Sequence, residues 1–291
     1  MTLRSAVPVL VTVVLSSAAL VAQEQLTLLA SFTDQRTGKP VETMTPADLG
    51  VTEDGAAATV LKVEPVVRTV KVQVLIDNGA GVGRNIVELR TGVRGLLEAL
   101  PPDIETTLVA TAPQPRFLVK ATKSRDELLK GIDRLAPDTN TGRFTESLAE
   151  AAERATKDKD AFHVIIAAGT TSGDGRVAES DIQRATENVG RKPMIVHVLL
   201  YAGERSTTGG VTQVEVGEHV AKMTGGRYEF INAMTRYSTL LPELGSEVAK
   251  QLTSNTRQFR ITVQRPSGKK GNLGKVSVTS NSKALIGLWR E

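Results

Sequence analysis

Residues 70–252 alternate between apolar, strand-like runs and amphipathic, helix-like segments, and this alternation constrains the fold more than any other feature of the sequence. The runs at 70–76, 161–168 and 193–201 are almost continuously apolar, as expected of strands buried on both faces. Between such runs, segments like 85–100 carry apolar residues at close to 3.6-residue spacing, which predicts helices. Strands that alternate with helices of ten or more residues predict βαβ units and a mainly parallel sheet.

The full pattern predicts an α/β fold with a doubly wound, mainly parallel six-stranded sheet and helices on both faces. The expected strands lie at 70–76, 105–111, 116–121, 161–168, 193–201 and 228–231. The expected helices lie at 85–100, 124–135, 143–156, 177–189, 214–223 and 234–252. The second and third strands are close enough in sequence to form a hairpin, so we expect one antiparallel strand in the sheet.

The two flanks of this region contain short strand-like runs without helices between them. They lie at 25–32, 48–53 and 59–63 before it, and at 258–264, 274–279 and 283–289 after it. Asp54-Gly55 is a strong hairpin signal between two of them. Each flank is too short to build its own core. We therefore expect one small β-domain from residues 23–68 and 254–291, with the α/β domain at 69–253 inserted in it.

The N-terminus has the pattern of a secretory signal peptide at residues 1–22. Arg4 precedes an apolar run at 6–20, and small residues follow it up to Ala22. The run is too short to span a bilayer comfortably, although an uncleaved anchor is the alternative. We expect cleavage near Ala22 and a secreted or periplasmic protein. The sequence contains no cysteine, which excludes disulfides, thiolate metal sites and cysteine nucleophiles.

Positive charge is concentrated near the C-terminus. The formal net charge is +4, and residues 248–290 contain nine Lys or Arg residues and no Asp or Glu. Such a stretch is either a solvated face or a surface that docks to anionic envelope material. The candidates for docking are Arg257, Arg260, Arg265, Lys269, Lys270 and Lys275. The export signal and an aromatic content of 3% argue against nucleic acid as the partner.

A candidate site follows the first strand of the α/β region. Ligands of doubly wound sheets bind beyond the carboxyl ends of the strands, and the first strand ends at Asp77. The glycines that follow match neither a dinucleotide fingerprint nor a P-loop, so they predict a tight turn. Asp77 itself is either a site residue or a carboxylate that accepts hydrogen bonds from nearby backbone N–H groups.

Residues 72–81, which read V-Q-V-L-I-D-N-G-A-G, resemble the first strand and loop of von Willebrand factor A (VWA) domains. That family has Asp-x-Ser-x-Ser there, which begins its metal-ion-dependent adhesion site. Residues 138–142 resemble the second loop of that site, and 161–169 resemble the fourth strand, which usually ends in Thr-Asp-Gly. The flanks resemble those of a bacterial secreted "VWFA-related" family described mainly from acidobacteria, at residues 32–34, 38–41, 45–49, 51–55 and 258–289.

The sequence departs from the family at its metal ligands. Gly79 and Gly81 stand where the family has serines, and Ala168 stands where it has a second aspartate. Only Asp77 and Thr139 match the ligand positions. Magnesium prefers six oxygen ligands in near-octahedral geometry. We therefore expect a degenerate site that binds no metal, and no cofactor.

The resemblance implies an exported protein-binding or scaffolding module whose partner is another protein. The candidate partner face is Asp77, Asn78, Gly79, Gly81, Asp138, Thr139 and Asp174. A metal-dependent adhesin, with Asp138 or Asp174 replacing the lost ligands, is the alternative. We expect no enzymatic activity, because no recognisable motif places a base beside a nucleophile. The sequence also indicates no small-molecule substrate. His163 and His197 lie in buried runs and are expected to be satisfied core residues.

Overall fold

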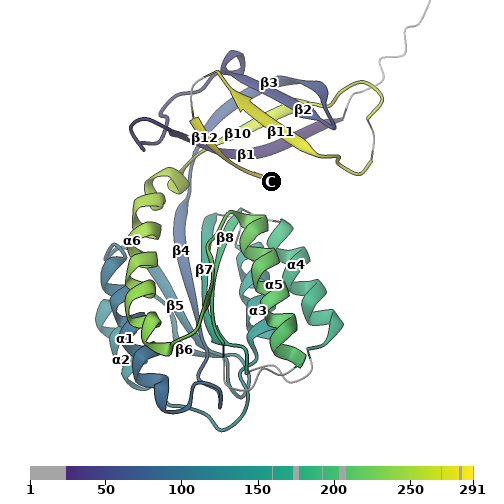
Figure 1. Cartoon of the computed structure of the whole chain (residues 1–291). Coiled ribbons are helices and arrows are strands. Elements are labelled where there is room, and N and C mark those ends of the chain that lie inside the picture. Colours follow the sequence, from purple (N-terminus) through teal and green to yellow (C-terminus); the bar gives the residue numbers. More distant parts are fainter. Residues whose placement is uncertain are drawn as a thin grey trace, which may run out of the picture.

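The computed structural model describes residues 24–290, except 159, 173–176, 192, 203–207, 270 and 282–283. The expected signal peptide at 1–22 lies outside the described residues. The described residues form two six-stranded sheets, and helices cover one of the two sheets (Figure 1). Within the described part of the chain, no helix is both long enough and apolar enough to cross a membrane.

The two sheets have six strands each, and we name them after the parts of the chain to which they belong. The larger sheet is the one in the larger, helix-covered part, and the smaller sheet is the one in the smaller part built of strands. The larger sheet has the strand order β6-β5-β4-β7-β8-β9. Five strands are parallel, and β6 forms the expected antiparallel hairpin with β5. The bounds are β4 Thr69–Ile76, β5 Glu105–Ala110, β6 Arg116–Thr122, β7 Ala161–Thr170, β8 Met194–Tyr201 and β9 Tyr228–Ile231. The chain proceeds from β4 to one edge and then returns to the other side of β4, so the strand order reverses between β4 and β7. The predicted α/β fold class is confirmed.

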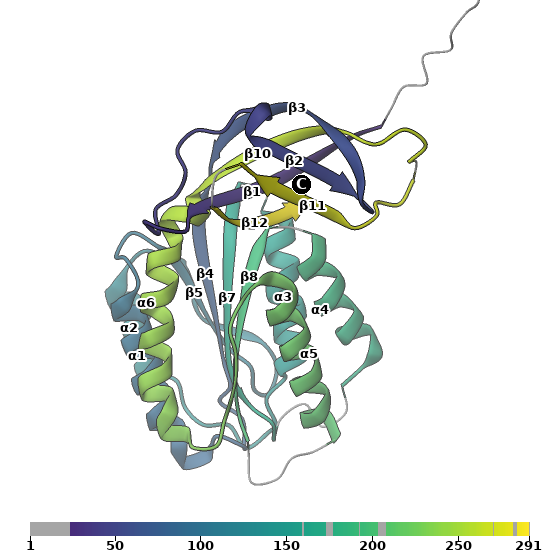
Figure 2. The same ribbon diagram turned by 45° about the horizontal axis from the view of Figure 1, so that its top comes forward.

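Six helices cover the two faces of this sheet (Figures 1 and 2). On one face lie α1 Ile86–Ala99, α2 Arg125–Asp133 and α6 Tyr237–Thr256. On the other lie α3 Phe144–Lys157, α4 Glu179–Arg191 and α5 Thr208–Thr224. Side chains of β4 contribute to the hydrophobic cores on both faces of the sheet, because alternate side chains of a strand point to opposite faces. Val72 and Val74 pack in the core under α1 and α6, whereas Leu75 packs in the core under α3.

The smaller sheet interleaves strands from both ends of the chain. Its order is β11-β2-β3-β10-β1-β12, and all its pairs are antiparallel. The bounds are β1 Gln25–Asp34, β2 Leu49–Glu53, β3 Ala56–Val67, β10 Arg257–Gln264, β11 Val276–Ser280 and β12 Ala284–Arg290. Asp54 and Gly55 both have positive φ in the turn between β2 and β3, as a type I′ hairpin turn requires. That the two flanks fold as one domain separate from residues 69–253 stays a prediction.

Candidate functional site

The loops that follow the parallel strands gather at the end of the larger sheet that is remote from the smaller sheet (Figures 1 and 2). Asp77 comes directly after β4, next to the point where the strand order reverses. Three more segments meet it: the one after β5, the one before α3 and the end of β7. This is where ligand sites of doubly wound sheets lie.

Asp77 is buried, and its carboxylate is used by hydrogen bonds within the chain. One oxygen accepts from the N–H of Gly79 at 2.8 Å and lies 3.4 Å from the hydroxyl of Thr111. The other accepts from the N–H of Thr170 at 3.0 Å and from its hydroxyl at 2.9 Å. Asp77 is only 2% exposed. A carboxylate in this state connects three loops and has little capacity left for another ligand.

Asn78 is a second internal connector at the same edge. Its side-chain amide donates to the carbonyl of Ala136 at 3.0 Å, and its side-chain oxygen accepts from the N–H of Ala112 at 3.0 Å. The backbone N–H of Asp138 donates to the carbonyl of Asn78 at 2.6 Å. Asn78 is 1% exposed, and its side chain connects the loops from within.

The glycines of the first loop are in close contact with the other loops. A Cβ at residue 79 would collide with the backbone of Gly142 and lie 2.9 Å from the carbonyl oxygen of Asn140. A Cβ at residue 81 would lie 2.5 Å from the Cβ of Ser172. Since real Cβ atoms do not approach other atoms so closely, a serine fits at neither position without movement of the backbone around it.

Gly142, and not Thr139, is the second-loop residue that lies against Asp77. A Cβ at residue 142 would collide with the Asp77 carboxylate, whereas Thr139 is exposed. Asp138 is half-buried, and the N–H and side-chain amide of Asn140 donate to its carboxylate, both at 2.8 Å. These bonds hold the pKa of Asp138 below its usual value. Asp174 lies outside the described residues.

Tyr237 lies beneath this edge of the sheet and was not expected from the sequence. It is fully buried, and its hydroxyl contacts the carbonyl oxygen of Gly169 and that of Leu199, the latter at 3.0 Å. Burial, and to a smaller degree the charge of Asp77, raises the pKa of Tyr237 well above its usual value. The hydroxyl therefore stays protonated and serves as a donor to the ends of β7 and β8.

Comparison with solved structures identifies this architecture. A von Willebrand factor type A protein from Catenulispora acidiphila superposes with a TM-score of 0.52 and 12% sequence identity, over 93% of this chain and 74% of that one. The fold is that of a VWA domain. BatB from Bacteroides thetaiotaomicron (TM-score 0.47, 15% identity, 62% of this chain and 99% of that one) and the vWF domain of the pilus tip protein Mfa5 from Porphyromonas gingivalis (0.48, 11%, 63% and 96%) are also similar. No protein-family model and no curated protein sequence matches the chain.

The residues present do not fit the metal ion of a VWA adhesion site. Among the described residues, Asp77 is the carboxylate at the centre, and its oxygens already accept hydrogen bonds from Gly79 and Thr170. The described residues contain no group of three or more His, Asp or Glu side chains placed to hold a metal ion. The loops also occupy the space in which serine ligands would stand, because residues 79, 81 and 142 have no room for a Cβ.

The basic residues near the C-terminus are not one free surface. Arg265 is only 4% exposed and forms two hydrogen bonds to the carboxylate of Glu53, at 3.0 and 2.6 Å, and one to that of Glu24 at 2.7 Å. Arg265 is therefore removed from the proposed docking set, since a buried, paired cation cannot face an external surface.

The other members of that set differ in their surroundings. Lys269 pairs with Asp54 at 2.7 Å, and Arg257 pairs with Glu42 at 3.0 Å. Arg260 is half-buried in β10, Lys275 is exposed, and Lys270 lies outside the described residues. The N-terminal part of the chain thus supplies the acidic side chains that the C-terminal stretch lacks. These acidic groups reduce the excess positive charge that the sequence predicted for this surface.

Proposed function

We propose that this chain is an exported, non-enzymatic protein-binding module that contacts its partner through the loops at the carboxyl ends of the VWA sheet, without a metal ion. The observation that carries the proposal is the closed state of the Asp77 site. Its carboxylate accepts hydrogen bonds from Gly79, Thr111 and Thr170, which supports a fixed junction of loops in place of a metal-dependent adhesion site. A rigid platform lowers the entropic cost of ordering loops on binding.

Four exposed arginines around this junction favour an acidic partner. They are Arg84, Arg116, Arg143 and Arg236, and none forms an ion pair within the described part of the chain. The loops that hold them are tied to the junction. The N–H of Arg143 donates to the carbonyl of Thr111, and Arg116 lowers the pKa of Asp138 through its charge. Arg236 directly precedes the buried Tyr237.

These arginines offer what a metal ion would otherwise supply, which is positive charge directed at a carboxylate. Guanidinium groups bind carboxylates through two parallel hydrogen bonds, so acidic side chains of a partner protein suit this face. We infer that Asp77 and Asn78 support the face from below, while the exposed loop residues Thr139 and Ala80 contribute to the contact itself.

A crosslinking experiment tests both the location and the metal independence. A photo-crosslinking residue at position 143 should capture one discrete partner from the envelope fraction of the source cells, equally well with EDTA or with magnesium. The matched control is position 103, an exposed turn residue at the opposite end of the sheet, where no such product is expected. Capture that requires magnesium would support the adhesin alternative, and equal capture at position 103 would contradict the proposed face.

Charge variants test the nature of the partner. The change Arg143→Glu should reduce capture strongly, because it places a carboxylate against an acidic partner. Lys123→Glu makes the same charge change elsewhere and should leave capture unchanged. Export is tested by N-terminal sequencing of the native protein, which should begin between Ala19 and Gln25, as the apolar run after Arg4 predicts.

A further inference from the structure

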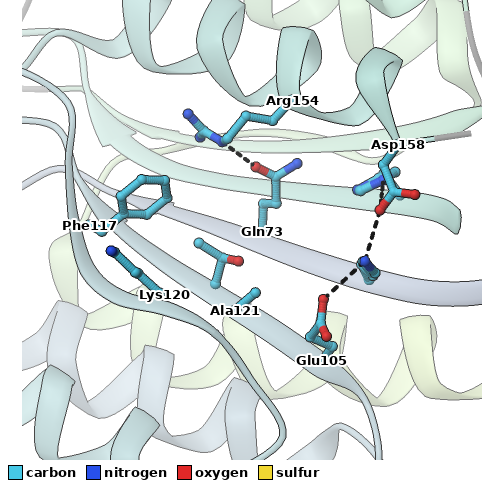
Figure 3. Close-up of a pocket in the computed structure, with 10 residues that line it drawn as sticks. Gln73, Glu105, Phe117, Lys120, Ala121, Arg154 and Asp158 are labelled. Atoms are coloured by element: carbon cyan, nitrogen blue, oxygen red, sulfur yellow. Dashed lines mark hydrogen bonds and ion pairs between the residues drawn. The ribbon is translucent and has the colours of Figure 1, made fainter.

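A pocket of about 290 Å³ opens on the α3 face of the larger sheet, at the opposite end from Asp77 (Figure 3). Lys71 and Gln73 of β4 form part of its wall, together with residues of β5, β6, β7 and α3. Lys71 precedes Asp77 by six residues, which corresponds to about 20 Å along a strand. The pocket is therefore separate from the loops assigned to protein binding, and its volume is near the lower end of the range for small-molecule sites, which begins at about 300 Å³.

The floor of this pocket is polar where the pattern of the sheet predicts apolar side chains. Leu75 and Val109 are paired neighbours on this face and pack in the core under α3. Moving toward the amino ends, the next pair on the same face is Gln73 beside Thr107, and the one after it is Lys71 beside Glu105. Gln73 is only 5% exposed and Thr107 only 9%. Burying polar side chains costs free energy, so core packing alone does not account for them at these positions. A small number of polar groups in fixed positions is typical of ligand sites.

A buried histidine at this end makes only a long polar contact, with an aspartate. His163 of β7 lies beside Lys71 and is 5% exposed, and neither ring nitrogen makes a hydrogen bond within the described residues. Its Nε2 lies 3.5 Å from the carboxylate of Asp158. His163 is buried as expected, and its polar contact is with this carboxylate. Buried polar side chains that are left unpaired are uncommon in folded proteins and mark sites where a ligand or water completes the bonding.

The charges of the pocket are not balanced. The ammonium of Lys71 is shared between Glu105 at 3.2 Å and Asp158 at 2.8 Å, so these three groups neutralise one another to a net charge of minus one. Arg154 and Lys120 supply two further positive charges on the other side of the pocket (Figure 3). Because Arg154 pairs with Glu150, the positive charge that is not neutralised at this end is that of Lys120.

The two cations differ in how they are held. Arg154 donates to the side-chain oxygen of Gln73 at 3.0 Å and pairs with Glu150 at 3.4 Å, and its guanidinium lies 5.2 Å from the centre of the Phe117 ring. Lys120 is exposed and forms no ion pair with any described residue. Its ammonium is therefore the group that is free to bind an incoming anion.

Phe117 gives the pocket an apolar wall next to these cations. It is 47% exposed, which is high for a phenylalanine, and it lies beside Lys120 and Ala121 on β6 (Figure 3). An exposed aromatic ring at the mouth of a pocket offers a flat surface for stacking or edge contacts. The arrangement combines one flat apolar surface with one unpaired ammonium a short distance away.

We propose that this pocket binds a small organic monocarboxylate with a flat apolar body. Lys120 binds the carboxylate, with the charge of Arg154 adding to the attraction, and the body of the ligand lies against Phe117 and Ala121. The acidic group Glu105–Asp158 at the far end repels a second negative charge, which restricts the ligand to a monoanion. No bond is made or broken in the ligand.

The test uses the mature chain and three aromatic carboxylates, which are benzoate, phenylacetate and indole-3-acetate. At least one should bind saturably in an NMR titration, with shifts confined to residues around Phe117 and His163. The matched neutral amide, such as benzamide for benzoate, should bind at least about tenfold more weakly, because the hydrogen-bonded ion pair with Lys120 is lost.

Two variants with equal charge changes locate the site. Lys120→Gln should weaken the carboxylate at least about tenfold, whereas Lys123→Gln, which removes an exposed charge three residues away, should not. Phe117→Leu keeps an apolar side chain and should weaken binding while the preference for carboxylate over amide persists. Absence of saturable binding for all three carboxylates, equal binding of the amide, or an unchanged affinity of Lys120→Gln would each overturn the proposal.

Discussion

The carboxylate of Asp77 accepts hydrogen bonds from both the N–H and the hydroxyl of Thr170, 93 residues further along the chain. Thr170 is the last residue of β7, so this contact connects the two central strands just beyond their last paired residues, Ile76 and Ala168. A buried carboxylate without partners would be costly. Donors from the loops offset that cost within the described structure, which supports our proposal that this site works without a cation.

The first prediction is that Asp77→Asn destabilises the chain. The amide cannot accept from both Gly79 and Thr170, since its NH₂ group would face one of these donors. Hydrogen bonds to charged groups contribute roughly 1.5–3 kcal/mol each and are not additive, so we expect a loss of about 3 kcal/mol in the free energy of unfolding. Urea unfolding measures it, with Asp103→Asn in an exposed turn as control. Equal stability of the two variants would show that the junction carries no such role.

The second prediction concerns stability at acid pH. Burial, with a smaller contribution from Arg227, lowers the pKa of His197 from 6.5 to about 4. The ring is therefore neutral in the fold and binds a proton more readily when the chain is unfolded. The contribution of the neutral ring to the free energy of unfolding is therefore fully present above pH 6.5 and is lost as the pH falls toward 4. At about 1.36 kcal/mol per pKa unit, this contribution amounts to about 3 kcal/mol.

The variant His197→Gln isolates this effect from the carboxylates that titrate in the same range. Glutamine can still accept the hydrogen bond from the N–H of Arg227 but cannot gain a proton. Its unfolding free energy should therefore fall less between pH 7 and about pH 4 than that of the unmodified chain. His219→Gln removes an exposed histidine and should leave the pH dependence unchanged. An unaltered slope in His197→Gln would refute the assignment.

The third prediction is that Arg265 stabilises the smaller sheet by connecting the two ends of the chain. Its guanidinium joins Glu53 of β2 and Glu24 at the start of β1, and it also donates to the carbonyl of Gly271 at 2.9 Å. Removal of one partner of a buried pair leaves the other charge uncompensated. Arg265→Gln should therefore lower the melting temperature much more than Arg94→Gln, which breaks the exposed pair with Asp133. Hydrogen exchange should rise in β1 and β2 together, and a rise confined to β10 would contradict the connection.

The sequence was sufficient to predict the larger sheet because its strands are marked locally. All ten residues of β7, for example, are buried, and its apolar run is visible without knowledge of any partner. Strand β3 shows the limit of this approach. It was expected at 59–63, but it continues to Val67 because Glu64 and Val66 pair with Arg260 and Gln258 of β10. Strand β3 has no buried residue, and its pairing with a strand distant in sequence leaves no periodic apolar signal.

The place of Asp77 in the fold was predicted from the sequence, but its contacts only in part, and the role of this edge as a binding site stays a prediction. Asp77 was placed correctly because the residue after a buried central strand lies at the carboxyl edge of the sheet. Thr170 and Gly142 were missed, since their contacts with Asp77 depend on how three distant loops meet. The resemblance to VWA domains favoured Thr139, which the structure leaves exposed. Likewise, the charge of Arg265 was visible, but its pairing with Glu53 follows from the strand order of the smaller sheet.

The fourth prediction is that magnesium or manganese does not stabilise the chain. Magnesium prefers six oxygen ligands and gives up its waters reluctantly, and here it would face one carboxylate that is already hydrogen-bonded. A site at ten times its Kd would add about 1.4 kcal/mol to the unfolding free energy, which thermal unfolding detects. We expect no shift with either ion. A saturable shift that Asp77→Ala abolishes would mean that Asp138 or Asp174 completes a metal site, and the adhesin alternative would then replace our proposal.

The last prediction is that restoring the family's serine does not restore a metal site. Gly79→Ser supplies a hydroxyl ligand, but its Cβ would collide with the backbone of Gly142 and press on the carbonyl of Asn140. Overpacking of this kind costs about 1–3 kcal/mol, and the loop before α3 must move for the serine to fit. We therefore expect a lower melting temperature and still no response to magnesium. Ala80→Ser adds the same hydroxyl at the adjacent, exposed position and should be neutral. A Gly79→Ser variant that keeps its stability and gains a magnesium-dependent shift would mean that the loops open easily, and that the closed junction around Asp77 is a mobile arrangement and not a fixed platform.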